Sequence, residues 1–145
     1  MIKGLNKLIN KAKEQGNLIG VNIFSSHFIS HLMFVDDVLL AGNGSYGEWK
    51  DFSLIIGLFC EATRMEVRPT KSCFLRNGLS SEVFEHINRL FPCKSHTLDK
   101  GIKYLGYMLK PDNYLINDWN WLVKKVERRI NNLCYRWLSL GGVLH

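Results

Sequence analysis

Two adjacent aspartates, Asp36 and Asp37, interrupt an apolar run in the first third of the chain. Burying a carboxylate is costly unless a cation or hydrogen bonds compensate its charge, so the pair limits how this segment can fold. The apolar flanks predict two strands, over residues 28–34 and 38–41. We therefore expect residues 35–37 to form the tight connection of a β-hairpin that carries both carboxylates.

The aspartate pair has two interpretations. Aspartates at a hairpin tip can simply form a solvated turn. Alternatively, a turn braced by apolar strands makes a rigid support for a divalent cation. Magnesium prefers oxygen ligands, commonly one or two carboxylates plus substrate phosphates, and a pair of such ions promotes phosphoryl transfer. Asp36 and Asp37 are therefore candidate ligands for Mg²⁺ or Mn²⁺, and the pattern alone leaves both interpretations open.

Composition bounds the class of protein. Hydrophobic residues make up 46% of the 145-residue chain and charged residues 22%, which predicts a globular fold with a core and not disorder. No apolar run approaches the roughly 18 residues that a membrane-spanning helix needs, so we expect no membrane partner. The formal net charge is +6, and most of the excess lies in the last third of the chain. This charge favours a polyanionic partner.

Helical and extended patterns alternate along the rest of the chain. The lysines of the first helix are expected to form a solvated face, and His31 to be an ordinary strand residue. Apolar spacing and turn residues predict a helix of about four turns that ends near Gly16, a short strand over 18–24, a loop over 42–47, a helix over 49–59 that ends before Arg64, two extended pieces around Pro69, a helix from Ser80 or Ser81 to Pro92, and a hairpin over 101–113 with Gly106 at a close approach.

The last helix has the clearest pattern. Its basic residues lie mainly away from its apolar stripe. We expect Trp119 and Trp137 to lie in a core, and Trp121, which falls off the stripe, to be exposed. The stripe consists of Trp119, Leu122, Val123, Val126, Ile130, Leu133 and Trp137.

Several motifs together resemble one known family. Residues 29–42, ISHLMFVDDVLLAG, resemble the catalytic hairpin of reverse transcriptases, whose turn reads [FY]-x-D-D. The helical segment before this hairpin is similar to the family's preceding helix. In the order of the family, TRMEVRPTKSCFL then resembles its G-L-x-[IV]-N-x-x-K-[ST] motif, and IKYLGYML resembles its Y-L-G primer grip. The segment WLVKKVERRINNLCYRWLSLGG is similar to the first thumb helix of LINE-type, non-LTR retrotransposon enzymes.

The resemblance implies an α+β fold. Residues 1–110 would form a partial polymerase palm, an antiparallel sheet that carries the FVDD hairpin and has helices on one face. Residues 111–145 would form the start of a helical thumb. The partners implied are an RNA template and a DNA primer, with deoxynucleotide triphosphates in the full-length enzyme.

The resemblance also implies roles for individual residues. Asp36 would bind both Mg²⁺ (or Mn²⁺) ions, Asp37 would be the second carboxylate, and Lys71 would lie near the phosphates of the incoming nucleotide. The turn formed by Tyr104, Leu105 and Gly106 would hold the primer end. The nucleic-acid backbone would be contacted by Lys124, Lys125, Arg128 and Arg129.

The sequence departs from the family pattern in three ways. The family's other catalytic aspartate lies on a strand upstream of the first helix, and residues 1–145 do not include it. Val38 stands where family members often have threonine, and Arg64 and Arg68 replace the glycine and asparagine of the lysine motif. We therefore expect weak metal binding and no polymerase activity from these residues on their own. The alternative is a basic relic that binds nucleic acid without catalysis.

Overall fold

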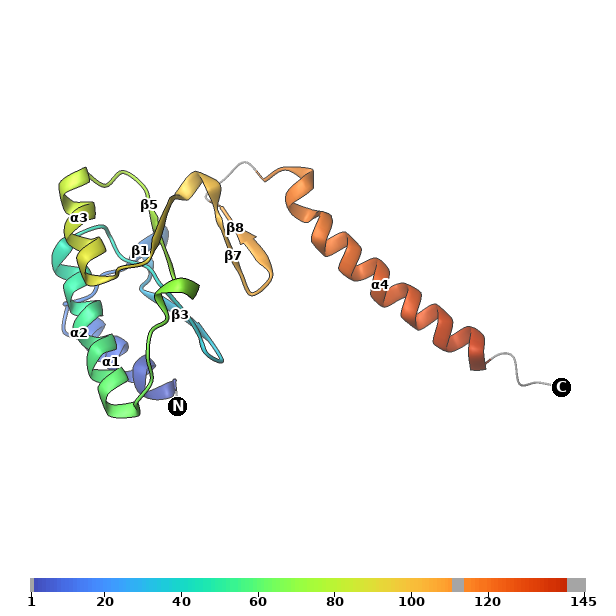
Figure 1. Cartoon of the computed structure of the whole chain (residues 1–145), viewed down its shortest axis with the longest axis horizontal. Coiled ribbons are helices and arrows are strands. Elements are labelled where there is room, and N and C mark those ends of the chain that lie inside the picture. Colours follow the sequence, from blue (N-terminus) through green and yellow to red (C-terminus); the bar gives the residue numbers. More distant parts are fainter. Residues whose placement is uncertain (1, 111–113, 141–145) are drawn as a thin grey trace. The chain divides into compact units, whose positions relative to one another are not determined.

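The structure is a computed structural model (Figure 1). It describes residues 2–110 and 114–140, and it describes the side chains of all these residues except 100 and 134–140. The chain packs as two compact units, Met1–Thr97 and Leu98–His145. The predicted α+β class is confirmed, because helices and short strands alternate in both sequence and structure. The division into a palm over 1–110 and a thumb over 111–145 stays a prediction.

The first unit contains three α-helices, one 3₁₀ helix and six short strands. In order they are α1 (Lys3–Glu14), β1 (Val21–Phe24), β2 (His27–Ile29), β3 (His31–Phe34), β4 (Asp37–Leu40), α2 (Tyr46–Thr63), η1 (Pro69–Lys71), β5 (Cys73–Arg76), α3 (Ser81–Leu90) and β6 (Lys94–Thr97). The predicted helices are confirmed. The extended piece expected before Pro69 is not a strand, and the segment after it begins with η1.

The helices begin and end where local residues dictate. The Ser45 hydroxyl accepts a hydrogen bond from the backbone N–H of Glu48 and caps α2, and Ser80 caps α3 in the same way through Val83. Helix α2 ends at Thr63, and the residue after it, Arg64, has a φ of 57° in the left-handed region.

The strands of the described residues form four separate two-stranded ladders. Three are antiparallel hairpins, whereas β5 and β6 pair in parallel. The expectation of one antiparallel sheet is therefore wrong for the residues that the structure describes. Helix α3 connects β5 to β6, and a helical crossover of this kind lets two strands run in the same direction. Within this unit the three helices lie on one side of the strands (Figure 1).

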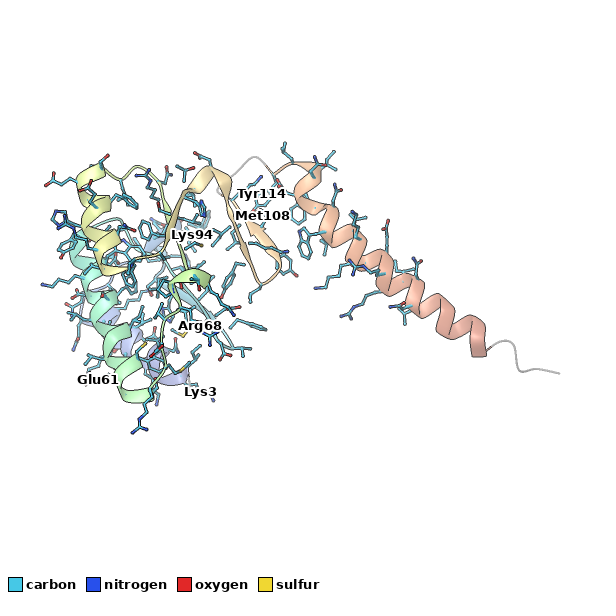
Figure 2. All side chains as sticks on the ribbon, viewed as in Figure 1. Lys3, Glu61, Arg68, Lys94, Met108 and Tyr114 are labelled. Carbon is cyan, nitrogen blue, oxygen red and sulfur yellow. The ribbon has the colours of Figure 1, made fainter. Side chains whose placement is uncertain are left out.

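The core of the first unit is formed by residues of α1, α2, α3 and β5 together with Leu18. Figure 2 draws the side chains of these elements. Helix α2 packs against both α1 and α3. Trp49 is at the centre of an aromatic group, with ring centroids 5.1 Å from Phe74, 5.5 Å from Phe52 and 5.8 Å from Phe91. Burying each such side chain contributes about 1.5–3 kcal/mol. The buried apolar residues are Leu5, Ile9, Ala12, Leu18, Trp49, Phe52, Phe59, Phe74 and Ile87.

The second unit contains η2 (Leu98–Lys100), the hairpin of β7 (Ile102–Tyr104) and β8 (Tyr107–Leu109), and the long helix α4 (Ile116–Leu140). The predicted helix is confirmed, and so is the predicted hairpin over residues 102–109; residues 111–113 of its predicted range lie outside the described residues. None of the helices in the described ranges is long and apolar enough to span a membrane.

Most of the described apolar stripe of α4 is exposed, and Leu122 is partly buried. Trp119 is 46% exposed and Ile130 is 52% exposed, so the expectation that Trp119 lies in a core is wrong. Trp121, expected to be exposed, is partly buried because the β7–β8 hairpin packs on its ring. Trp137 was also expected to lie in a core, but its side chain is outside those that the structure describes.

Candidate functional site

The aspartate pair lies at the end of the β3–β4 hairpin. Phe34 pairs with Asp37, which leaves Val35 and Asp36 as a two-residue turn. The predicted tight connection is confirmed, and it is one residue shorter than expected because Asp37 already belongs to β4. Val35 has a φ of 53°. Glycine is usual at this turn position, and a β-branched residue there is strained.

The register of the hairpin decides which way its side chains point. Cross-strand partners share a face, so Phe34 and Asp37 lie on the same face as Leu32 and Leu39. The opposite face carries Met33 and Leu40, which pack against the core. Asp37 is therefore on the hairpin face directed away from the core.

The hairpin tip is exposed to solvent. Asp36 and Asp37 are exposed, Phe34 is 57% exposed and Val35 is 70% exposed. The apolar residues on this face are exposed or only partly buried, because the core covers only the other face of this two-stranded ladder. The carboxylates keep their hydration, so a cation is not needed to offset burial, and a solvated turn remains a full alternative.

The donor set fits a hard cation only in part. Two carboxylate groups one residue apart provide oxygen ligands of the type that Mg²⁺ and Mn²⁺ accept. Across residues 2–110 and 114–133, no three histidine, cysteine, aspartate or glutamate side chains gather closely enough to hold a metal ion. Asp36 and Asp37 would thus leave most coordination positions to water or to substrate phosphates.

Lys71 lies on a different element from the aspartates. It is the last residue of η1, its side chain is exposed, and its backbone N–H donates to the Arg68 carbonyl oxygen at 3.0 Å. None of its described hydrogen bonds or ion pairs reaches the hairpin. The structure therefore brings Asp36 and Asp37 together by local folding, and it leaves the role of Lys71 as a prediction.

The predicted primer-grip residues form the turn of the second unit's hairpin. Tyr104 pairs with Tyr107, so Leu105 and Gly106 are the two turn residues. Their φ values are 51° and 86°, the signature of a type I′ turn. A Cβ at Gly106 would meet only the Trp121 ring at 4.0 Å, an ordinary contact. The turn conformation, and not the expected close approach, is what requires glycine here.

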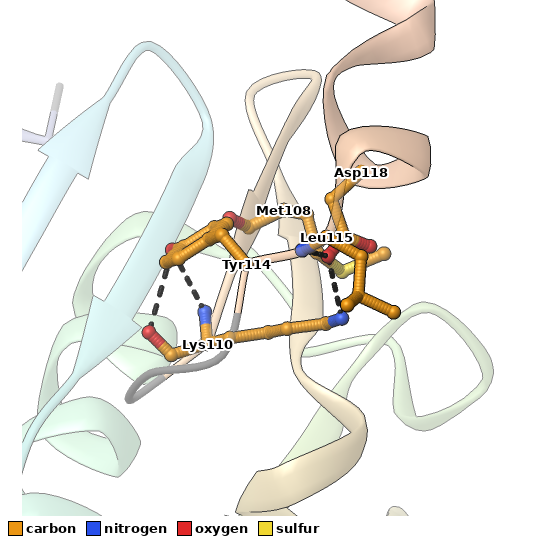
Figure 3. Close-up of polar contacts among 5 residues, drawn as sticks. All are labelled: Met108, Lys110, Tyr114, Leu115 and Asp118. Carbon is orange, nitrogen blue, oxygen red and sulfur yellow. Dashed lines mark hydrogen bonds and ion pairs between the residues drawn. The ribbon is translucent and has the colours of Figure 1, made fainter.

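Polar contacts join this hairpin to the start of α4 (Figure 3). The Lys110 ammonium donates to Asp118 Oδ2 at 2.8 Å, and the backbone N–H of Leu115 donates to the same oxygen at 2.8 Å. These two hydrogen bonds, in that order of importance, lower the pKa of Asp118. The Tyr114 hydroxyl accepts from the Lys110 backbone N–H at 3.1 Å and lies 3.0 Å from the Met108 carbonyl oxygen, to which it can donate.

The predicted nucleic-acid contacts lie together on α4. Lys124, Lys125, Arg128 and Arg129 are all exposed and occupy adjacent turns of one face. The Lys125 ammonium lies 5.9 Å from the centroid of the Trp121 ring. An exposed strip of cations of this kind can bind the phosphates of a nucleic acid.

Two polar groups in the first unit make contacts that the sequence did not predict. Glu48 is 4% exposed, and its carboxylate accepts three backbone N–H groups. The S-x-x-E spacing of Ser45 and Glu48 is a helix-start signal that could have drawn attention to it. His31 is a strand residue, as expected, but its ring nitrogens contact Ser30 and Asn6, and burial followed by the charge of Lys13 lowers its pKa.

Comparison with known proteins gives no match. No protein-family model matches the chain, and neither does a curated protein or a solved structure. What the site can do chemically is therefore argued from its own side chains. Two exposed carboxylates on a short turn can bind a hard cation weakly, and a basic helix joined to a hairpin can bind a polyanion.

Proposed function

We propose that residues 1–145 are part of an RNA-directed DNA polymerase of the kind found in LINE-type retrotransposons. They would provide a part of the palm and the start of the thumb. The observation that carries this proposal is the position of the FVDD motif, whose Val35 and Asp36 form the turn of a β-hairpin with Asp37 next to it. An Asp36 in the middle of a helix would have been incompatible with a polymerase palm.

The order of the later elements supports the same proposal. A second hairpin carries Leu105 and Gly106 at its turn, as a Y-L-G primer grip requires, and a long basic helix follows it. Independent motifs that agree in both order and local structure are harder to explain by chance than the aspartate pair alone.

Each group has a defined task in this proposal. Asp36 and Asp37 would hold the Mg²⁺ or Mn²⁺ that supplies a Lewis acid for nucleotidyl transfer. Lys71 would neutralise charge on the triphosphate and donate a proton to the leaving pyrophosphate. The Leu105–Gly106 turn would hold the primer end, and the cations of α4 would bind the backbone of the template–primer duplex.

We expect residues 1–145 alone to be inactive. The family resemblance requires a further aspartate from a strand upstream of α1, which these residues do not include. Asp37 is a poor replacement, because it stands next to Asp36 and belongs to β4. Electrostatic positioning supplies nearly all of the rate in phosphoryl transfer, so a partial site loses many orders of magnitude.

A second candidate function is a basic module that binds nucleic acid without catalysis. It is favoured by the exposed, two-carboxylate tip of the β3–β4 hairpin, beside which the described chain supplies no third metal ligand. The exposed cations of α4 serve equally well in this function.

Primer extension on an RNA template separates the two candidates. A chimaera would join residues 1–145 to the fingers and first palm strand of an active LINE-type enzyme, with Mg²⁺ or Mn²⁺ present. Extension that is lost in the Asp36→Ala, Asp37→Ala variant supports the polymerase. A folded chimaera that binds the template–primer without extending it supports the non-catalytic module. Extension by residues 1–145 alone, above the same double variant, would contradict the expected need for the upstream aspartate.

A further inference from the structure

The β7–β8 hairpin contacts the basic face of α4. An ion pair joins Lys110, next to the hairpin, to Asp118 of the helix, and a ring contact joins Tyr107 of the hairpin to Trp121. Asp118, Trp121 and Lys125 follow one another at intervals of three and four residues, so they lie along one face of the helix. The same face then continues to Arg128 and carries the exposed cations.

Trp121 lies at the centre of this junction. Its ring meets that of Tyr107 edge to face, with centroids 5.0 Å apart and planes at 87°. The backbone of Gly106 lies near the same indole, since a Cβ built on Gly106 would lie 4.0 Å from Trp121 Cζ3. The Lys125 ammonium is 5.9 Å from the ring centroid. The Trp121 indole therefore contacts Tyr107 of the hairpin and lies near Lys125, one of the exposed cations.

The dimensions of this surface match a nucleic-acid strand. From Trp121 to Arg129 the helix rises by about 12 Å, at about 1.5 Å per residue. Successive phosphates of one strand advance by about 3.4 Å along a duplex, so this length corresponds to about three phosphates. Tyr107 is 53% exposed and lies at the hairpin end of the strip.

We infer that Trp121 is a positioning residue that makes the Leu105–Gly106 turn and the cations Lys125 and Arg128 act as one binding surface for a nucleic-acid backbone. This inference rests on the nucleic-acid partner of the proposed function. Without Trp121, the turn and the helix would each contact the nucleic-acid strand separately, and holding the ligand would cost additional conformational entropy.

The experiment compares the affinity of the whole chain for a 5′-labelled RNA–DNA hybrid of about 20 base pairs, by fluorescence anisotropy at low salt. Trp121→Ala should weaken binding about three- to tenfold, the size expected from one aromatic pair. Trp121→Phe should restore most of the affinity, because a ring remains against Tyr107. Leu133→Ala, a truncation on the exposed apolar stripe of the same helix, should change it less than twofold.

A second pair of variants keeps the inference testable if Trp121→Ala disturbs α4. Tyr107→Ala removes the hairpin side of the contact and leaves the helix sequence intact. It should lose as much affinity as Trp121→Ala, and the double variant should lose no more than either single one. Losses that multiply in the double variant would overturn the inference, because they would mean that each ring binds the ligand independently.

The remaining outcomes distinguish this inference from the proposed function. If the unmodified chain binds the hybrid and both single variants bind it equally well, Trp121 has no positioning role, while the proposed function stands. If the unmodified chain does not bind the hybrid even at low salt, the proposed nucleic-acid partner is wrong and the inference is overturned with it.

Discussion

Glu48 Oε1 accepts a hydrogen bond of 2.6 Å from the backbone N–H of Gly20, although the two residues lie 28 positions apart. The same oxygen accepts from the Ile19 N–H at 2.7 Å, and Oε2 accepts from the Asn43 N–H at 2.6 Å. Gly20 is required there, because its φ is +85° and a Cβ would collide with the Ile29 carbonyl oxygen. The start of α2 is therefore tied to the segments before β1 and after β4, which frame the candidate catalytic hairpin.

Replacing Glu48 by alanine should destabilise the protein by about 3–5 kcal/mol, because backbone N–H groups that it satisfies would lose their partner inside the fold. Urea denaturation followed by circular dichroism measures the change. Glu61→Ala, at an exposed position of the same helix, is the matched control and should change stability by less than about 0.5 kcal/mol. Similar losses of stability in the two variants would show that the hydrogen bonds of the Glu48 carboxylate do not stabilise the fold.

Stability should fall as the pH drops below the ordinary pKa of His31. Burial, and then the charge of Lys13, lower the pKa of His31 from its usual 6.5. The unfolded chain then binds more protons than the folded chain below about pH 6.5, so folding is favoured less at about pH 5 than at about pH 7.5. Protonation also removes the acceptor that Nδ1 offers to the Ser30 hydroxyl.

Denaturation midpoints of His31→Gln and His27→Gln check this pH dependence. His27 is exposed in β2, so its replacement should leave the slope of stability against pH as in the unmodified protein. His31→Gln should flatten the slope between about pH 5 and pH 7.5. An unchanged slope in His31→Gln would mean that other groups govern this range.

Mg²⁺ or Mn²⁺ should bind at the β3–β4 turn with a dissociation constant on the order of millimolar, because two carboxylates leave most ligand positions to water. Asp36→Asn should abolish this binding. Paramagnetic broadening by Mn²⁺ of amide signals near Val35 provides the measurement. The control is Asp99→Asn, an exposed carboxylate outside the hairpin, which should leave the broadening intact. Broadening that survives Asp36→Asn would place the ion elsewhere.

Binding to a nucleic-acid duplex should depend steeply on salt. About four phosphate contacts predict a slope of log K against log salt of about −3 to −4. Charge reversal of Lys124, Lys125 and Arg128 together should remove the binding, because their exposed side chains provide most of the contacts.

The matched control for this prediction is charge reversal of three exposed lysines of α1: Lys3, Lys7 and Lys11. It changes the net charge of the chain by the same amount, but we expect these lysines to form a solvated face. An equal loss of affinity in the two triple variants would indicate a general charge effect. Affinity that depends on base sequence would point to another mode of recognition.

The sequence by itself determined the elements whose signals are local. Apolar spacing located α1 and α4, a serine marked the start of α3, and the position of Asp36 between two apolar runs predicted the turn of the β3–β4 hairpin. Each of these signals involves residues within a few positions of one another. Their outcome depends on backbone geometry and short-range hydrogen bonds, which neighbouring residues control.

Only the tertiary structure decided which faces are covered and which distant groups meet. The sequence pattern favoured burial of Trp119, yet Trp121 is the tryptophan that packs on a hairpin, because the β7–β8 hairpin folds back onto the other face of α4. Likewise, S-x-x-E spacing marks Glu48 as a helix-start residue, but nothing near it in the chain specifies Gly20 as its partner. Burial and long-range pairing are set by how whole elements pack, and local patterns limit the packing without selecting it.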